Sequence, residues 1–141
     1  MAVRIIHLPA ECLLVTRYSD AHSAQDAEAV VMALETNRQY ATCDKFLIDL
    51  AAVSTIETSA AKRPDRLDRM LAAVRQGRDP THDNLILIAY FAPAPPGDGL
   101  ARSYQPQWNT RAGIVSMASR SLSDCATFLN VTLTDLVAAG G

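Results

Sequence analysis

The sequence contains no apolar run that approaches the ~18–20 residues of a membrane-spanning helix. Near its start, His7, Pro9 and Glu11 interrupt the apolar residues, which argues against a signal peptide. Lys and Arg number 13 and Asp and Glu 15, so the net charge is −2 and no overall positive field favours nucleic acid or an anionic membrane. We therefore expect a cytoplasmic protein with no nucleic-acid partner and no stable membrane insertion.

Cysteine and histidine are also scarce. The three cysteines are far apart and form no CxxC pair: Cys12, Cys43 and Cys125. This spacing is typical of reduced thiols. The three histidines fall on different segments: His7, His22 and His82. None has another ligand at metal-binding spacing, so we expect surface or capping histidines and no metal.

Nucleotide-binding and catalytic motifs are absent as well. There is no Walker A sequence, no GxGxxG and no G-x-S-x-G elbow. Residues 92–99, APAPPGDG, contain glycines, but their prolines remove N–H donors that a phosphate-binding nest needs. No acid–base or nucleophile–base pair is evident. We predict a protein that is not an enzyme, with no catalytic residue and no cofactor.

What the sequence does contain is an alternation of strand and helix patterns. Its 141 residues suit one domain, 1–141. Strands are predicted at 3–7, 12–18, 46–50, 85–91 and 114–117. Helices are predicted at 23–39, 64–77, 100–105 and 121–130, with a separate turn at 133–138. The order ββαβαβαβα predicts an α/β fold with a mixed, mostly parallel sheet of four to five strands, about four helices and an N-terminal hairpin at one edge.

Several helix ends carry recognisable signals. Ser23 is a predicted N-cap, and Asn130 is suited to a left-handed C-cap. Pro106 is expected to stop the short helix at 100–105, which leaves Trp108 in a further turn.

The stretch DKFLIDLAAVSTIETSA, residues 44–60, combines a buried strand with a polar exit. Ligands often bind at the carboxyl ends of strands in such sheets, so we expect a functional loop at 51–63. Asp49 lies inside the apolar strand, where a carboxylate needs partners. We expect it to accept amide hydrogen bonds from the loop, in a structural role.

Within this stretch, LIDLAAVSTIETSA (47–60) resembles the motif of the STAS domain, the anti-sigma-factor-antagonist or SpoIIAA-like fold. The family pattern is a buried strand ending Asp-Leu, a small-residue turn and Asp-Ser-Ser-Gly before a helix. In signalling members a partner kinase phosphorylates the Ser that follows the Asp. The matching position here is Thr58, between Glu57 and Ser59. The resemblance therefore implies a regulatory domain with Glu57, Thr58 and Ser59 as partner or phospho-switch candidates.

A second group with this fold resembles lipid-binding SEC14-like proteins and includes bacterial members. The predicted helix LARSYQ, residues 100–105, fits this group as well. Near it, Arg102, Tyr104 and Trp108 either wall a pocket, with Arg102 as its cation, or simply cover the sheet.

A cluster of basic residues lies around the start of the predicted helix at 64–77: Lys62, Arg63, Arg66 and Arg69. It either holds an anion near the helix N-terminus or forms a solvated face that Asp65 and Asp68 neutralise.

The sequence thus leaves two functions open. The first is recognition of a protein partner through the 51–63 loop and the following helix. The alternative is a small anionic or amphipathic, lipid-like ligand between the 51–63 and 92–104 loops. The ligand candidates are Arg63, Arg66, Arg102, Tyr104 and Trp108. A homodimer formed through an edge strand is also open.

Overall fold

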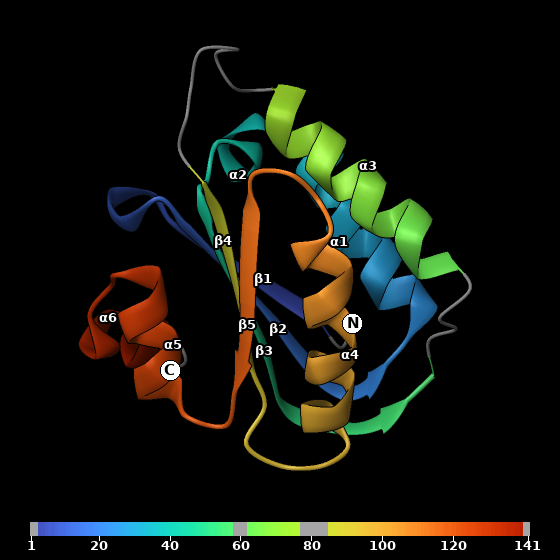
Figure 1. Ribbon diagram of the computed structural model, residues 1–141, viewed down its shortest axis with the longest axis vertical. Coiled ribbons are helices and arrows are strands. Elements are labelled where there is room, and N and C mark those ends of the chain that lie inside the picture. The colour runs from blue at the N-terminus through green and yellow to red at the C-terminus, as the bar shows by residue number, and fades with distance from the viewer. Residues whose placement is uncertain (1–2, 58–61, 77–84, 140–141) are drawn as a thin grey trace.

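A computed structural model describes residues 3–57, 62–76 and 85–139. Five strands form one sheet in the order β1-β2-β3-β4-β5 (Figure 1). Their bounds are β1 Val3–Leu8, β2 Leu13–His22, β3 Lys45–Ile56, β4 Ile86–Phe91 and β5 Ile114–Ser119. β1 runs antiparallel to β2, and the other neighbouring strands are parallel.

Helices cover both faces of the sheet. Their bounds are α1 Ala24–Thr36, α2 Arg38–Ala41, α3 Arg63–Gln76, α4 Gly97–Asn109, α5 Leu122–Leu129 and α6 Leu133–Ala139. Figure 1 shows α1, α3 and α4 over one face and α5 and α6 over the other. Because strand side chains alternate, Leu14 and Phe46 join the core under the first group, while Leu13 and Leu47 join the core under the second.

The predicted α/β class, the element order and the N-terminal hairpin are confirmed. The described residues hold six α-helices rather than about four, partly because α2 separates from α1. Two predicted caps are present. Ser23 Oγ accepts the Asp26 N–H at 3.1 Å, and Asn130 is left-handed with φ 55°.

The segment expected to be a loop from residue 51 is strand as far as Ile56. β2 also continues past its predicted end at residue 18, and two register shifts keep it paired with residues 52–56 of β3. Asp49 makes the expected contact at this point. Its carboxylate accepts the Ala51 N–H at 2.9 Å and the Arg17 Nε–H at 3.1 Å. Pairing with β2 therefore extends β3 beyond the end that its local composition predicts.

The prediction for α4 was wrong at both ends. The helix starts at Gly97 and continues through Pro106 to Asn109. A proline in a helix interior destabilises the helix by about 3 kcal/mol. Pro106 lies on the exposed side of α4. The buried face of α4 carries on past it at helical spacing, from Leu100 and Tyr104 to Trp108. Packing of that face against the sheet outweighs the missing hydrogen bond.

Gly97 is expected to be the least replaceable residue of α4. A Cβ added there would lie 2.8 Å from the backbone oxygen of Leu50, which cannot move aside alone. Gly97→Ala should therefore lower the free energy of unfolding by about 1–3 kcal/mol. Gly99→Ala is the matched control, because nothing lies within 4 Å of its added Cβ. It should be neutral or up to about 1 kcal/mol stabilising. Urea unfolding measures both, and equal losses would contradict this packing.

The free edge of β5 is partly occupied by a side chain. Asn109 Oδ1 accepts the Ser116 N–H at 2.8 Å, and Asn109 Nδ2 donates to the Ser116 carbonyl at 3.4 Å. This amide takes hydrogen bonds that another strand would otherwise make, which disfavours pairing between two β5 edges. The homodimer stays a prediction.

Candidate anion and ligand site

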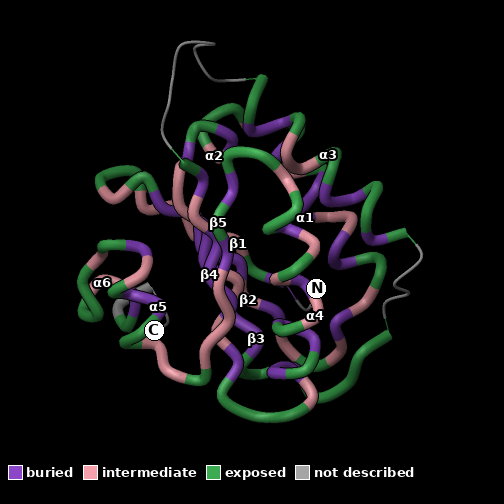
Figure 2. The backbone as a smooth tube through the Cα atoms, in the orientation of Figure 1, coloured by how far each residue is buried: buried purple, intermediate pink, exposed green. Residues whose placement is uncertain are grey.

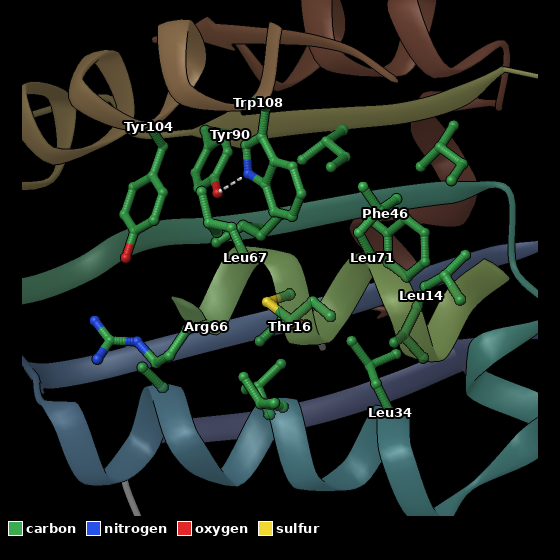
Figure 3. A pocket seen from close by; sticks show the side chains of 18 of the residues that line it. Leu14, Thr16, Leu34, Phe46, Arg66, Leu67, Leu71, Tyr90, Tyr104 and Trp108 are labelled. Atoms are coloured by element: carbon green, nitrogen blue, oxygen red, sulfur yellow. Dashed lines mark hydrogen bonds between the residues drawn. The ribbon is translucent and has the colours of Figure 1, made fainter. Parts of the chain in front are cut away.

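An apolar cavity of about 60 Å³ lies between the sheet and the helices α1, α3 and α4. Figure 3 shows Leu14 and Leu34 towards one end and the Arg66 guanidinium with Tyr104 at the other. Aliphatic side chains make most of the wall between them. The cavity therefore has a hydrocarbon body and one cationic, aromatic end.

Arg66 is the cation of that end. It comes from the first turn of α3 and is 8% exposed. Its Nη2 atom is buried and has no hydrogen-bond partner among residues 3–57, 62–76 and 85–139. A buried guanidinium normally pairs with a carboxylate or with several acceptors, because desolvation otherwise destabilises it. Arg66 is thus charged, buried and incompletely satisfied.

Arg63 lies one turn earlier on α3 and is 6% exposed. Its Nη1 donates to Ser103 Oγ at 2.9 Å, and its guanidinium carbon lies 4.2 Å from the ring centre of Tyr104. These contacts fix the side chain against α4. Its buried Nε has no hydrogen-bond partner in the described part of the chain. Two neighbouring arginines thus each hold a buried, unused N–H group.

Aromatic rings wall this end of the cavity. Tyr104 stacks on Tyr90 with ring centres 5.2 Å apart, and Trp108 Nε1 donates to the Tyr90 hydroxyl at 2.8 Å. His22, at the end of β2, lies 4.5 Å from Tyr18 and 6.3 Å from Tyr104 between ring centres. Strands β2 and β4 and helices α3 and α4 all contribute to the cluster.

Burial, followed by the charges of Arg63 and Arg66, lowers the pKa of His22 from its ordinary 6.5 to about 4. Burial also raises the pKa of the Tyr18 hydroxyl, with smaller contributions from Tyr104 and Asp26. His22 and Tyr18 are therefore neutral at pH 7. The formal charges of the cluster are the two guanidiniums and the carboxylate of Asp26, which is 7% exposed.

The structure brings together four of the five ligand candidates. Arg66, Tyr104 and Trp108 line the cavity, and Arg63 lies against the ring of Tyr104 beside it. The structure places Arg102 elsewhere: its side chain is 70% exposed and lies 3.7 Å from the carboxylate of Asp98. A helical turn on α4 points Arg102 away from Tyr104, so Arg66 supplies the cation that was expected from Arg102.

The remaining basic residues and partner candidates lie on the surface or outside the residues that the structure describes. Lys62 is exposed, and Arg69 pairs with Glu28 and Glu35 of α1, each at 2.7 Å. Glu57 is exposed just after β3. Thr58, Ser59, the predicted helix end Gly77 and His82 lie outside the described residues.

His22 is a member of the cluster that its sequence context did not indicate. It was expected on the surface or in a cap, but it is 2% exposed. The available signal was the alternation Thr16, Tyr18, His22, interrupted by a bulged stretch with register shifts between Arg17 and Ser19 and between Asp20 and Ala21, where the φ of Asp20 is 61°. Extending the strand through that bulge places His22 beside Tyr18, on the face that α1 and α3 cover.

In the described segments, no group of three His, Cys, Asp or Glu residues is arranged to hold a metal ion. No helix there has the length and apolar character to cross a bilayer.

No protein-family model matches the sequence, and no curated protein does. Among solved structures, the anti-sigma factor antagonist SpoIIAA in its unphosphorylated form is similar over 92% of this chain and 98% of that one. The TM-score is 0.53 and the sequence identity 12%. The chain therefore has the SpoIIAA-like, or STAS-like, α/β fold that the motif at 47–60 indicated. At this identity the likeness concerns the fold alone.

Proposed function

We propose that this domain is a non-enzymatic binding protein for a small amphipathic anion. The ligand places its charged group at Arg63 and Arg66 and its apolar part in the cavity. The observation that carries this proposal is the buried Nη2 of Arg66, which has no partner in the described residues and lies at the end of an apolar cavity.

The site is complementary to an anion with an apolar body. An anion at this end would accept hydrogen bonds from the unused N–H groups of Arg63 and Arg66. Hydrogen bonds between charged groups of this kind are stronger than those between neutral groups. Both arginines lie in the first turn of α3, where the helix dipole also favours negative charge. The aliphatic wall then removes the ligand's hydrocarbon from water.

A panel of ligands with one chain length tests the proposal. Decanoate and decyl phosphate should bind, whereas decanol and decyltrimethylammonium should bind about 10–100-fold more weakly, because they lack acceptors for the arginines. Arg66→Gln should weaken anion binding by a similar factor. Isothermal titration calorimetry measures each affinity.

Arg102→Gln is the matched control, since Arg102 lies outside the cavity on exposed α4 surface. It should bind like the unaltered protein. Equal affinity for decanol and decanoate, or full anion affinity in Arg66→Gln, would contradict an anion site at Arg66.

A second candidate function is regulatory recognition of a protein partner through the end of β3 and the start of α3. β4 pairs only with Lys45–Asp49 of β3, so β2 and β3 extend past it as a ribbon. Figure 2 draws the end of this ribbon as exposed. Ile56 there is 37% exposed, beside exposed Glu57. The likeness in fold to an anti-sigma factor antagonist also supports a regulatory role.

Changes in this segment test the second candidate. Ile56→Asp, Glu57→Lys and Thr58→Ala should each abolish binding of a captured partner and leave thermal unfolding unchanged. Leu133→Asp on α6, where Leu133 is 43% exposed, is the control and should keep the partner. If the partner binds all three variants normally, the 51–63 segment is not the interface.

A further inference from the structure

We infer that Cys12 and Cys43 are a redox-active pair, whose two thiols a hydroperoxide oxidises to a disulfide. This is a second site, separate from the proposed anion site. Cys12 directly precedes β2, and Cys43 lies two residues before β3. Because β2 and β3 are parallel, the pair lies at their amino ends, whereas His22 of the aromatic cluster lies at the carboxyl end of β2.

The two cysteines share one groove of about 340 Å³ on the surface. Its other lining residues are His7, Pro9, Gln39 and Thr42. A groove of this volume is large enough to admit a small peroxide to the thiols.

Backbone hydrogen bonds hold the two cysteines close together. The Cys12 carbonyl accepts hydrogen bonds from the N–H groups of Asp44 and Lys45, each at 3.2 Å. Because the Asp44 nitrogen is bonded to the carbonyl carbon of Cys43, standard peptide geometry places the two cysteine Cα atoms within about 7 Å of each other. Disulfides usually join Cα atoms about 4.4–6.8 Å apart. The pair therefore needs little backbone movement to form a disulfide.

Cys12 is suited to react first. Its side chain is exposed, although cysteine is among the residue types most often buried. Its φ is 52°, a left-handed conformation that glycine and asparagine adopt more readily. Neither packing nor backbone preference explains a cysteine at this position, and its thiol is accessible to a dissolved oxidant.

Cys43 is suited to be the second thiol, which closes the disulfide. It is 1% exposed, so burial shields it from direct attack by the oxidant. Its Sγ donates to the Gln39 carbonyl at 3.9 Å. A thiol is a weak hydrogen-bond donor, so little is lost when this contact gives way to an S–S bond.

The oxidation has two steps. The Cys12 thiolate attacks a peroxide oxygen, the O–O bond breaks, and a sulfenic acid forms. The departing alkoxide, or hydroxide from hydrogen peroxide, takes up the proton that the thiol released. The Cys43 sulfur then attacks the sulfenic sulfur, so that the S–S bond forms, the S–O bond breaks and the hydroxyl leaves with the Cys43 proton as water. The thiols lose two electrons, which reduce the hydroperoxide.

Counting thiols by mass spectrometry tests the inference. The purified chain is treated with hydrogen peroxide in slight excess, denatured and alkylated. Before treatment all three cysteines should be alkylated, and afterwards only Cys125, which is buried. Tryptic mapping should show the peptides of Cys12 and Cys43 joined within one chain, and dithiothreitol should restore all three thiols.

Variants assign the order of the steps. Cys43→Ala should stop at the sulfenic acid of Cys12, which dimedone labels. Cys12→Ser should keep both remaining thiols at the same dose of peroxide. Cys125→Ala is the matched control and should form the same disulfide as the unaltered protein. The mapping of the unaltered protein needs no variant and decides the inference even where a variant fails to fold.

Three results would overturn the inference. They are three alkylated cysteines after treatment, oxidation of Cys12 without loss of the Cys43 thiol, and a disulfide that joins the Cys12 residues of two molecules. None of them concerns the binding of anions at Arg66, so the proposed function and the thiol pair are tested separately.

Discussion

Arg66→Met is expected to raise the free energy of unfolding by about 1–3 kcal/mol while it removes anion binding. Arg66 is 8% exposed, and its Nη2 lacks a partner in the described residues. A buried, incompletely paired charge destabilises the folded state, and an apolar side chain of similar length removes that penalty. For a chain of this size the gain corresponds to about 2–4 °C in melting temperature per kcal/mol.

If Arg66 serves to bind a ligand, its replacement should stabilise the fold and weaken binding at the same time. Arg102→Met is the control, and as an exposed change it should stay within about ±0.5 kcal/mol. Thermal and urea unfolding of the ligand-free proteins measure the stabilities. If Arg66→Met were destabilised by more than 1 kcal/mol, the charge of Arg66 would have a native partner, and the case for an empty anion site would fail.

Acidification from pH 6.5 to 4 is expected to destabilise the fold by about 3 kcal/mol through His22 alone. Its pKa is about 4 in the folded protein against an ordinary value of 6.5. The unfolded chain therefore binds the proton first as the pH falls. The stability that neutral His22 contributes is complete above pH 6.5 and is lost as the pH falls through 4.

The test compares the unaltered protein with His22→Asn from pH 4 to 7.5. The difference in their free energies of unfolding should change by about 3 kcal/mol across this window and be constant above it. Such a comparison removes the carboxylates that both proteins share, including Asp26. A difference that does not vary with pH would show that the pKa of His22 is not lowered by burial and by the charges of the two arginines.

Local patterns predicted the order of the elements because each signal lay within a few residues. Ser23 and Asn130 are caps that act on their own helices, and Pro9 lies at an edge hairpin. By contrast, the length of β3 depends on β2, and its pairing continues only because β2 bulges around residues 17–21. No pattern confined to either strand contains that information.

The sequence showed which residue types the site contains, but not how those residues are arranged in space. Arg63 and Arg66 indicated a basic start of the helix. Because acidic residues alternate with them, the same pattern was equally typical of a solvent-exposed helix face. Burial of Arg63 depends on Ser103 and Tyr104, forty residues away. Those contacts join α3 to α4, and no pattern confined to either helix shows which residues of the other it meets.

The most direct test of the anion site follows the side-chain Nε–H signals of the arginines by nitrogen-15 NMR during titration with decanoate. We expect the Arg63 Nε–H proton to move downfield and to exchange more slowly, because its unused donor gains a carboxylate oxygen. Arg69 Nε, which already donates to Glu35 at 3.3 Å, should not move, and decanol should leave both unchanged. If saturation with decanoate leaves the Arg63 signal unshifted, the carboxylate does not bind at Arg63, which would contradict the proposed anion site.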